Sequence, residues 1–559
     1  MKYLIPALFL LTFILQGCGG EKDEGNKVET EGIEMVKKEI ANFSPTELKY
    51  DDSILDDRQK IVVEKLYRAS KIIDDIFLNQ VYSKNEEIKA KLISENTEDV
   101  KLRLKLFNIM FGPFDRLERD RPFIGNEPKP LGANFYPEDM TKEEFESRIK
   151  NHPEDEKAFT SEFTMIRRDG RNLVAIPYSQ YFKDRLTKIS NILKDAGGYT
   201  DNPSLKKYLL TRADAFLSND YYESDMAWMD VKDNDIEVVI GPYEVYEDGL
   251  YNYKASFESF VTIRDPKESK KLEVFKKYLR DMEIHLPIPM EYKNLERGSE
   301  SPIAVVNEVY TAGDTKAGVQ TLAFNLPNDE RVRKAKGSKK VMLKNVSQAK
   351  YDKQLIPIAK IVLEPDQLQY VTFNSFFTHS LMHEISHGIG PGFIKVNGRE
   401  TEVRKELKET YATLEECKAD ILGMYNNVFM IEKGVFPKTF EKETYVTFLA
   451  GIFRSVRFGI NEAHGGGNTI IYNYLLEKGG YEYNSTTQQV NVNFSKIDHA
   501  LTELANLILM IQAKGDYHAA KGLIERYAVN SSSMRNLVDK LVNIPVDIKP
   551  VYEIEEMLK

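Results

Sequence analysis

Two histidines four residues apart, in the segment HEISH, constrain this chain more than any other feature of its sequence. On an α-helix, His383 and His387 lie one turn apart on the same face, where two imidazole nitrogens can meet one metal ion. Glu384 lies beside them and can reach a metal-bound water. Because the chain has only eight histidines, a chance match is improbable, and the segment predicts a zinc-binding helix. The alternative is a surface helix with solvated histidines.

A catalytic zinc ion needs a third protein ligand and an open position for water. A metzincin would have a histidine six residues after His387, but that residue is Phe393. Glu416, in the downstream segment EECKAD, is the expected third ligand, for one zinc ion per chain. Asp420 shares its helix face and can hold a ligand histidine by its second ring nitrogen. Glu415 points elsewhere and could reach the other histidine.

The first residues predict an export signal. Lys2 precedes an apolar run over residues 3–15, which is too short for a membrane anchor. The following LQGC resembles the lipobox of bacterial lipoproteins, which implies removal of residues 1–17 and a lipid on Cys18. An ordinary secretory signal with an incidental cysteine is the alternative. Residues 18–33 are expected to form a flexible tether, which would hold the protein at the periplasmic face or the cell surface.

Composition limits the remaining classes. The chain has 559 residues, 42% hydrophobic and 29% charged, which is ordinary globular composition and enough for two or more compact units. Its net charge of -10 argues against nucleic acid as a partner, because phosphate binding needs a basic face. Cys18 and Cys417 are the only cysteines. If Cys18 carries a lipid, no internal disulfide forms and the protein depends on its core.

Hydrophobic periodicity predicts a mostly helical α+β protein with a β-rich centre. Helical spacing extends over residues 34–111 and 178–216, and it returns from residue 369 to the end. Four β-rich segments lie between these regions. They are residues 236–240, 257–263, 340–343 and 356–363.

The two motifs together resemble the dipeptidyl peptidase III family of zinc metallopeptidases. That family pairs a first motif, usually HExxGH, with a second of the form EECRAE; here they read HEISH, one residue shorter, and EECKAD. The segment GPYEVY is similar to the family's segment with a substrate-binding glutamate and a catalytic tyrosine. The resemblance assigns these roles to Glu244 and Tyr246. Glu258, in SFESFV, matches an acidic residue of the following strand.

Two further segments extend the resemblance. FNLPN is similar to the family's NxPN segment and implies that Asn325 and Asn328 bind the peptide backbone; a turn around Pro327 is the plain alternative. His464, in EAH, matches an active-site histidine, although three glycines follow it here. It could instead be a histidine at a helix end.

The resemblance also implies two lobes around a wide cleft, with the zinc site on the helical lobe. The expected N-terminal lobe covers residues 34–265 and is helical, then β-rich. Residues 266–350 form a mixed segment that completes it. Residues 351–559 are the expected catalytic zinc lobe.

The predicted reaction is hydrolysis of short peptides. Zinc polarises the peptide carbonyl and activates water, while Glu384 takes the proton and passes it to the leaving amine. Tyr246 and His464 are expected to donate to the developing oxyanion. Glu244 and Glu258 can bind a free N-terminus by charge, and the resemblance implies release of dipeptides. A single-residue aminopeptidase and a weakly active peptide-binding lipoprotein are the alternatives.

Overall fold

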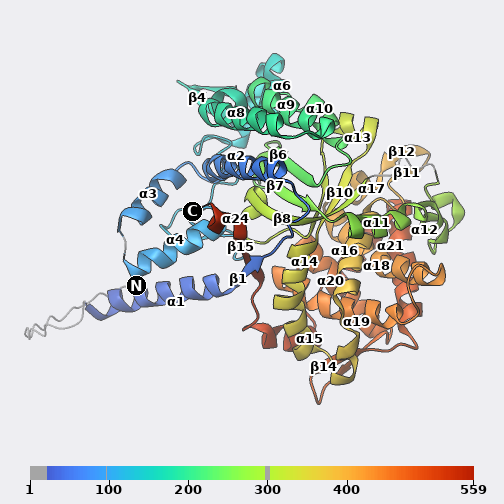
Figure 1. Cartoon of the computed structure of the whole chain (residues 1–559). Helices are drawn as coiled ribbons and strands as arrows, with labels where there is room; N and C mark the ends of the chain where they lie inside the picture. The colour runs from blue at the N-terminus through green and yellow to red at the C-terminus, as the bar shows by residue number, and fades with distance from the viewer. Residues whose placement is uncertain (1–21, 96, 296–301, 559) are drawn as a thin grey trace, which may run out of the picture.

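A five-stranded mixed sheet forms the centre of one lobe in the computed structural model, which describes residues 22–95, 97–295 and 302–558 (Figure 1). Neighbouring strands are antiparallel except β8 and β10, which are parallel. Every residue of β6 and β7 except the last is buried, because β-branched and aromatic side chains fill both faces. In sheet order the strands are β6 (Ile236–Glu244), β7 (Ser256–Arg264), β8 (Ile303–Gly313), β10 (Lys339–Leu343) and β9 (Ala323–Leu326).

Helix α2 (Asp57–Val81) covers this sheet and packs against α8 (Lys183–Tyr199). It begins at a reciprocal cap, in which Asp56 accepts from the backbone of Gln59 and the Gln59 side chain accepts from the backbone of Asp56. The other α-helices and strands between α2 and β6 are α3 (Asn85–Glu95), α4 (Glu98–Met110), β2 (Phe114–Asp115), β3 (Arg121–Pro122), α5 (Lys142–Asn151), α6 (Glu156–Phe159), β4 (Thr164–Asp169), β5 (Asn172–Pro177), α7 (Tyr178–Tyr181), α9 (Pro203–Ser218) and α10 (Tyr222–Met229).

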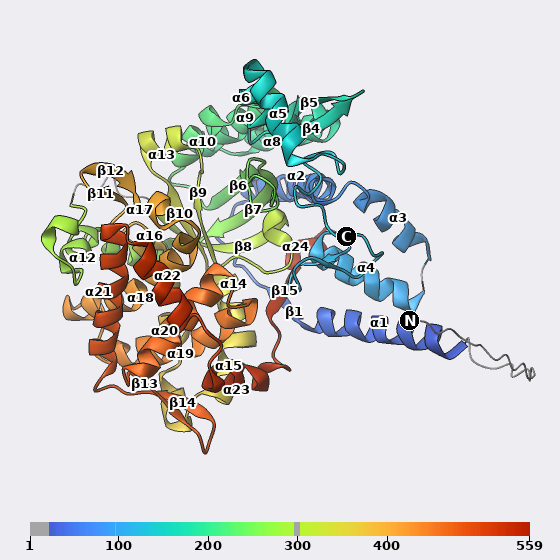
Figure 2. The same ribbon diagram turned by 180° about the vertical axis from the view of Figure 1, so that it is seen from behind.

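The second lobe is a helical assembly around its own apolar core, seen from both sides in Figures 1 and 2. Its centre is the contact between α16 (Phe373–His387) and α18 (Tyr411–Glu432). The surrounding elements are α17 (Val403–Leu407), α19 (Phe440–Ser455), α20 (Ala463–Glu477), α21 (Ile497–Lys514), α22 (Tyr517–Tyr527), α23 (Ser532–Val538) and the hairpins β11 (Phe393–Val396) with β12 (Arg399–Glu402) and β13 (Tyr481–Asn484) with β14 (Gln489–Val492). The mostly helical α+β class with two lobes is therefore confirmed.

The end of the chain returns to the sheet lobe. Strand β15 (Asp547–Tyr552) pairs in parallel with β1 (Phe43–Leu48), and both views place these strands beside each other. Asp547 is fully buried and lies 3.0 Å from Nζ of Lys350, at the end of α14 (Lys344–Lys350). The chain therefore crosses between the lobes again after the helical assembly. Three helices lie between β7 and β10, with β8 and β9 among them, and a fourth follows β15. They are α11 (Pro266–Lys276), α12 (Leu279–His285), α13 (Glu330–Lys336) and α24 (Glu553–Met557).

The structure corrects one predicted strand. Residues 356–363 were expected to be β-rich, but Ile356–Val362 is helix α15. Its buried residues are Ile358, Ala359 and Val362, which are spaced one and three residues apart and so share one face of a helix. The same apolar residues were read from the sequence as a strand. Strands β8 and β9 lie within residues 266–350, for which the sequence predicted a mixture of helix and strand without locating these two strands. The boundary residues of the lobes remain predictions.

The expected tether is also corrected. Residues 22–33 belong to helix α1 (Lys22–Ala41) rather than to a flexible segment. Lysines and glutamates spaced three and four residues apart favour such a helix. The predicted signal segment 1–17 and Cys18 lie outside the described residues. None of the helices within the described ranges has the length and hydropathy of a membrane span.

Candidate metal centre and peptide-binding site

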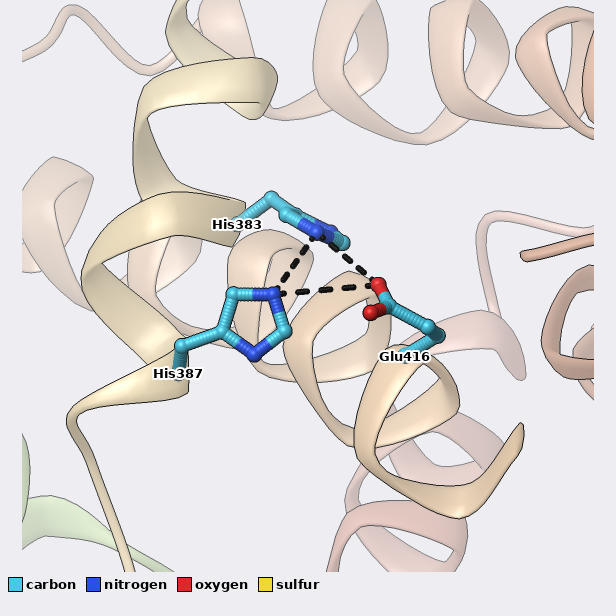
Figure 3. A group of neighbouring side chains, drawn as sticks. All are labelled: His383, His387 and Glu416. Atoms are coloured by element: carbon cyan, nitrogen blue, oxygen red, sulfur yellow. Dashed lines mark hydrogen bonds and ion pairs between the residues drawn. The ribbon is translucent and has the colours of Figure 1, made fainter. Parts of the chain in front are cut away.

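Helix α16 presents the two histidines to one point. Its first turn is capped by Thr372, whose hydroxyl accepts from the backbone of Ser375, and it ends at Gly388 directly after His387. The apolar residues of α16 pack into the helical core, which leaves His383 and His387 facing α18. Figure 3 shows the two rings reaching from one helix toward Glu416 on the next.

The three expected ligand atoms converge. Nε2 of His383 lies 3.1 Å from Nε2 of His387 and 3.2 Å from Oε2 of Glu416, and the remaining edge, from His387 to Glu416, is 3.7 Å (Figure 3). Ligands about 2.0–2.2 Å from a tetrahedral zinc ion lie about 3.3 Å from one another, so the triangle has the size that zinc requires. Oε2 of Glu416 is enclosed and accepts no hydrogen bond within the described residues. The donor set therefore fits the implied ion.

Carboxylates on α18 orient both rings. Oδ1 of Asp420 lies 2.7 Å from Nδ1 of His383, and Oε1 of Glu415 lies 3.0 Å from Nδ1 of His387. Such contacts fix the ring orientation and leave Nε2 free to bind a metal. Burial opposes ionisation of Glu415, but the charge of Lys418 at 2.8 Å and the contact with His387 together lower the pKa of Glu415 to about 2. The supporting carboxylates are therefore held in their charged form.

Two further residues support Asp420, and the sequence did not single out the first of them, Asn468. Asn468 on α20 donates to Oδ2 of Asp420 at 2.7 Å. His379 lies 3.3 Å from Oδ1 of Asp420, with its ring against Phe448. The only available signal for Asn468 was its place one helical turn after His464. Both contacts hold the carboxylate that orients His383.

The three glycines after His464 have a packing role. A Cβ at Gly467 would lie 2.9 Å from the backbone nitrogen of Cys417, and one at Gly465 would lie 2.0 Å from the carbonyl oxygen of Gly459. A larger residue at either position would push α20 away from its neighbours. Gly467 therefore lets α20 approach α18 closely enough for Asn468 to reach the candidate metal site.

His464 and Glu384 lie at the open side of the centre. Nδ1 of His464 is 3.1 Å from Oε2 of Glu416, and its side chain is 49% exposed. Both residues line a cavity of about 750 Å³ together with His383. Glu384 is thus a carboxylate beside the metal ligands and facing space that a substrate can enter.

The expected substrate-binding residues gather on the sheet lobe. Glu258 on β7 pairs across the sheet with Gly241 on one side and Gly313 on the other. Burial, then Glu244 and Asp314, raise the pKa of Glu258 well above its usual value. Burial, then neighbouring carboxylates, raise the pKa of Asp314 to about 7. This group of acids favours a bound cation. The sequence did not indicate Asp314, because its proximity to Glu258 depends on the pairing of β7 with β8.

The two asparagines frame the same region. Asn328 donates to the backbone oxygen of Tyr243 at 3.1 Å and also hydrogen-bonds Glu244. Oδ1 of Asn325, on the edge strand β9, is enclosed and binds no donor among the described residues. Polar groups therefore line the end of the sheet where the acids gather.

Tyr246 is not brought into contact with the metal ligands. Its side chain is 79% exposed, in the loop after β6, and it forms no hydrogen bond with a described residue. The charge of Glu244, then partial enclosure, then the charge of Glu416 raise the pKa of Tyr246 to about 12. Its phenol is therefore protonated at neutral pH and lies within electrostatic reach of both regions.

Two helix-borne histidines, a glutamate ligand and a free carboxylate facing a cavity define the class of mononuclear metallohydrolases. Residues 138–406 match peptidase family M49. Nudix hydrolase 3 of Arabidopsis thaliana is 38% identical over 95% of this chain and 76% of that protein. Dipeptidyl peptidase 3 of Dictyostelium discoideum is 27% identical over 52% of this chain and 46% of its own length.

Solved structures agree. Dipeptidyl-peptidase III from Caldithrix abyssi is similar at a TM-score of 0.93 and 65% identity, covering 94% of this chain and 100% of that one. Dipeptidyl-peptidase III from Corallococcus sp. strain EGB follows at 0.84 and 42%, covering 94% and 98%. The chain belongs to peptidase family M49 and is a metallopeptidase.

Proposed function

We propose that this chain is a zinc-dependent exopeptidase that removes dipeptides from the N-terminus of short peptides. The observation that carries the proposal is the convergence of His383, His387 and Glu416 within 4.8 Å, with Glu384 beside them. The acidic group on the facing lobe supports recognition of a free amino terminus. The names of the two dipeptidyl-peptidase III structures support release of dipeptides.

In this proposal His383, His387 and Glu416 hold one zinc ion. When bound, the ion polarises the peptide carbonyl and acidifies a water molecule. Glu384 accepts a proton from the attacking water and later delivers it to the leaving amine. His464, beside Glu416, donates a hydrogen bond to the developing oxyanion. Asp420 and Glu415 keep the two imidazole rings in their productive orientation.

Recognition of the substrate falls to the sheet lobe. Glu244 and Glu258, together with Asp314, bind the ammonium group of the peptide by charge. Asn325 and Asn328 hydrogen-bond the peptide backbone along the edge strand β9, whose outer side pairs with no strand of the described residues. Tyr246, between the two regions, donates to the reacting carbonyl oxygen.

The products from one short unblocked peptide test the proposal. We expect a series of dipeptides by mass spectrometry, with the reaction stopped by a chelator and restored by zinc. A series of single residues would instead establish the aminopeptidase alternative. Zinc binding without hydrolysis would establish the peptide-binding alternative, which the free carboxylate of Glu384 disfavours.

We also propose that the chain is exported as a bacterial lipoprotein and held at the periplasmic face or the cell surface. This rests on residues 1–18 of the sequence, where an apolar run leads into LQGC. Cys18→Ser should abolish incorporation of a labelled fatty acid in a bacterial host. Equal labelling of the variant would refute the anchor.

A further inference from the structure

Arg454, in the last turn of α19, lies unpaired in the cavity that also contains Glu384. Its guanidinium is flanked by the rings of Phe376 and Phe458, at 5.9 and 5.7 Å from their centroids. Nε is enclosed, and no described residue accepts a hydrogen bond or forms an ion pair with this side chain. The side chain is half-buried, and Asp547 and Asp420 act on its charge without pairing with it. A guanidinium that lines a cavity and has no acceptor is a place where an entering anion can bind.

The other basic side chains at this cavity are already engaged or lie in solvent. Lys350 and Arg116 are each ion-paired with a buried carboxylate, at 3.0 and 2.8 Å. Arg457 donates to two backbone carbonyls, and Lys38 is exposed. Arg454 therefore differs from its basic neighbours, because it is half-buried at the cavity and no described residue accepts a hydrogen bond from it or forms an ion pair with it.

Strand β9 shows on which side of the metal centre Arg454 lies. The start of β9, at Ala323, lines the cavity with Arg454. The chain then runs to Asn328, which meets Tyr243 and Glu244 at the acidic group. Helix α16 packs against this strand. A peptide whose N-terminus is bound by the acids thus points its C-terminal part toward the cavity.

The distance between Arg454 and the metal centre can be estimated along α16. Phe376, which flanks Arg454, comes seven residues before His383. At 1.5 Å per residue this is about 10 Å of helix. An extended peptide covers about 3.3 Å per residue, so about three residues fit between the metal centre and Arg454.

We propose that Arg454 binds the C-terminal carboxylate of the substrate, about three residues beyond the cleaved bond. The inference rests on the proposed release of dipeptides, since two residues before that bond and three after it make a pentapeptide. The enzyme then prefers peptides of about five residues with a free C-terminus. Arg454 acts as a specificity-determining residue, because a guanidinium pairs with a carboxylate through charge-assisted hydrogen bonds.

The test compares peptides of three to eight residues, each as the free acid and as the C-terminal amide. For the wild-type protein we expect the acid to exceed the amide in kcat/KM by about tenfold near five residues, mainly through KM. Arg454→Gln should bring this ratio to about one, and Arg454→Lys should retain part of it. Arg526→Gln, an exposed arginine of the same lobe, is the matched control.

The ratio is read within each variant, so a general loss of folding or activity does not alter it. Equal rates for acid and amide in the wild-type protein would overturn the inference and leave dipeptide release intact. An unchanged ratio in Arg454→Gln would also overturn it. Release of single residues would refute the proposed function, while an acid preference that depends on Arg454 would still support the carboxylate site. If Arg454→Gln does not fold, Arg454→Lys and the wild-type ratio decide.

Discussion

Asp420 on α18 lies 2.7 Å from Nδ1 of His383 on α16, and this contact turns Nε2 of the histidine toward Glu416. Burial opposes ionisation of Asp420, yet the charge of His383 and the hydrogen bonds from His379 and His383 hold the pKa of Asp420 well below its usual value. Asn468 binds the other oxygen. One carboxylate therefore connects α16, α18 and α20 at the metal centre.

Asp420→Asn should weaken zinc binding by about 10–100-fold, because an amide orients the imidazole less firmly and raises its basicity less. Competition with a fluorescent chelator measures the affinity. Glu409→Gln, at an exposed position before α18, serves as the control. An unchanged zinc affinity would show that Asp420 does not support the ligand.

Glu384→Gln should keep one zinc ion per chain and lower kcat by about 10²–10⁴-fold, because the amide cannot accept the proton of the attacking water. Elemental analysis and a dipeptidyl reporter give the two values. Turnover close to that of the wild-type protein would remove Glu384 from its assigned role.

Glu244→Gln should raise KM by about tenfold for peptides with a free N-terminus and leave kcat nearly unchanged, since a charge contact to the ammonium group is lost. Steady-state kinetics with free and N-acetylated peptides separate the effect. Glu143→Gln, exposed on α5 of the same lobe, is the control. A fall in kcat at constant KM would argue against N-terminus binding.

Removing one partner of the buried pair Lys350–Asp547 should destabilise the protein by about 3–5 kcal/mol, because the remaining charge is left unpaired. Urea unfolding of Asp547→Leu measures the loss, and adding Lys350→Met should recover much of it. Lys101→Met, which breaks an exposed pair with Glu98, should have little effect. An Asp547→Leu variant with unchanged stability would contradict the role of this pair in holding β15.

Stability should depend on pH through Glu308. Burial raises its pKa to about 7 from 4.5, although Tyr552 donates to it at 3.0 Å. The folded state then keeps a proton that the unfolded chain releases between pH 4.5 and 7, so stability falls as pH rises through this window. Glu308→Gln should reduce that fall by at most about 3 kcal/mol, measured by urea unfolding at pH 5 and pH 8. An identical pH dependence in the variant would rule Glu308 out.

Local pattern predicted much of the metal centre. The spacing of His383 and His387, the helix end at Gly388 and the shared face of Glu416 and Asp420 are properties of single helices, so the sequence alone indicated them. The strands at residues 236–240, 257–263 and 340–343 followed from β-branched residues in the same way. The strand predicted at residues 356–363 was wrong, because a short apolar run can belong to a strand or to a helix.

Contacts between distant segments could not be predicted in this way. Asn468 reaches Asp420 because Gly466 and Gly467 let α20 approach α18. Asp314 joins the acids through sheet pairing, and Arg454 reaches the metal-site cavity because α19 crosses α16. The return of β15 to β1 likewise joins residues about 500 positions apart.

The sequence by itself indicated that His383 and His387 share one face of a helix, because a helix places residues four apart on one face whatever surrounds it. It also indicated the family to which the chain belongs. Only the tertiary structure decided which groups support those ligands, which acids meet on the sheet and which arginine remains unpaired. Those properties arise from packing between elements that are remote along the chain, and no local spacing records them.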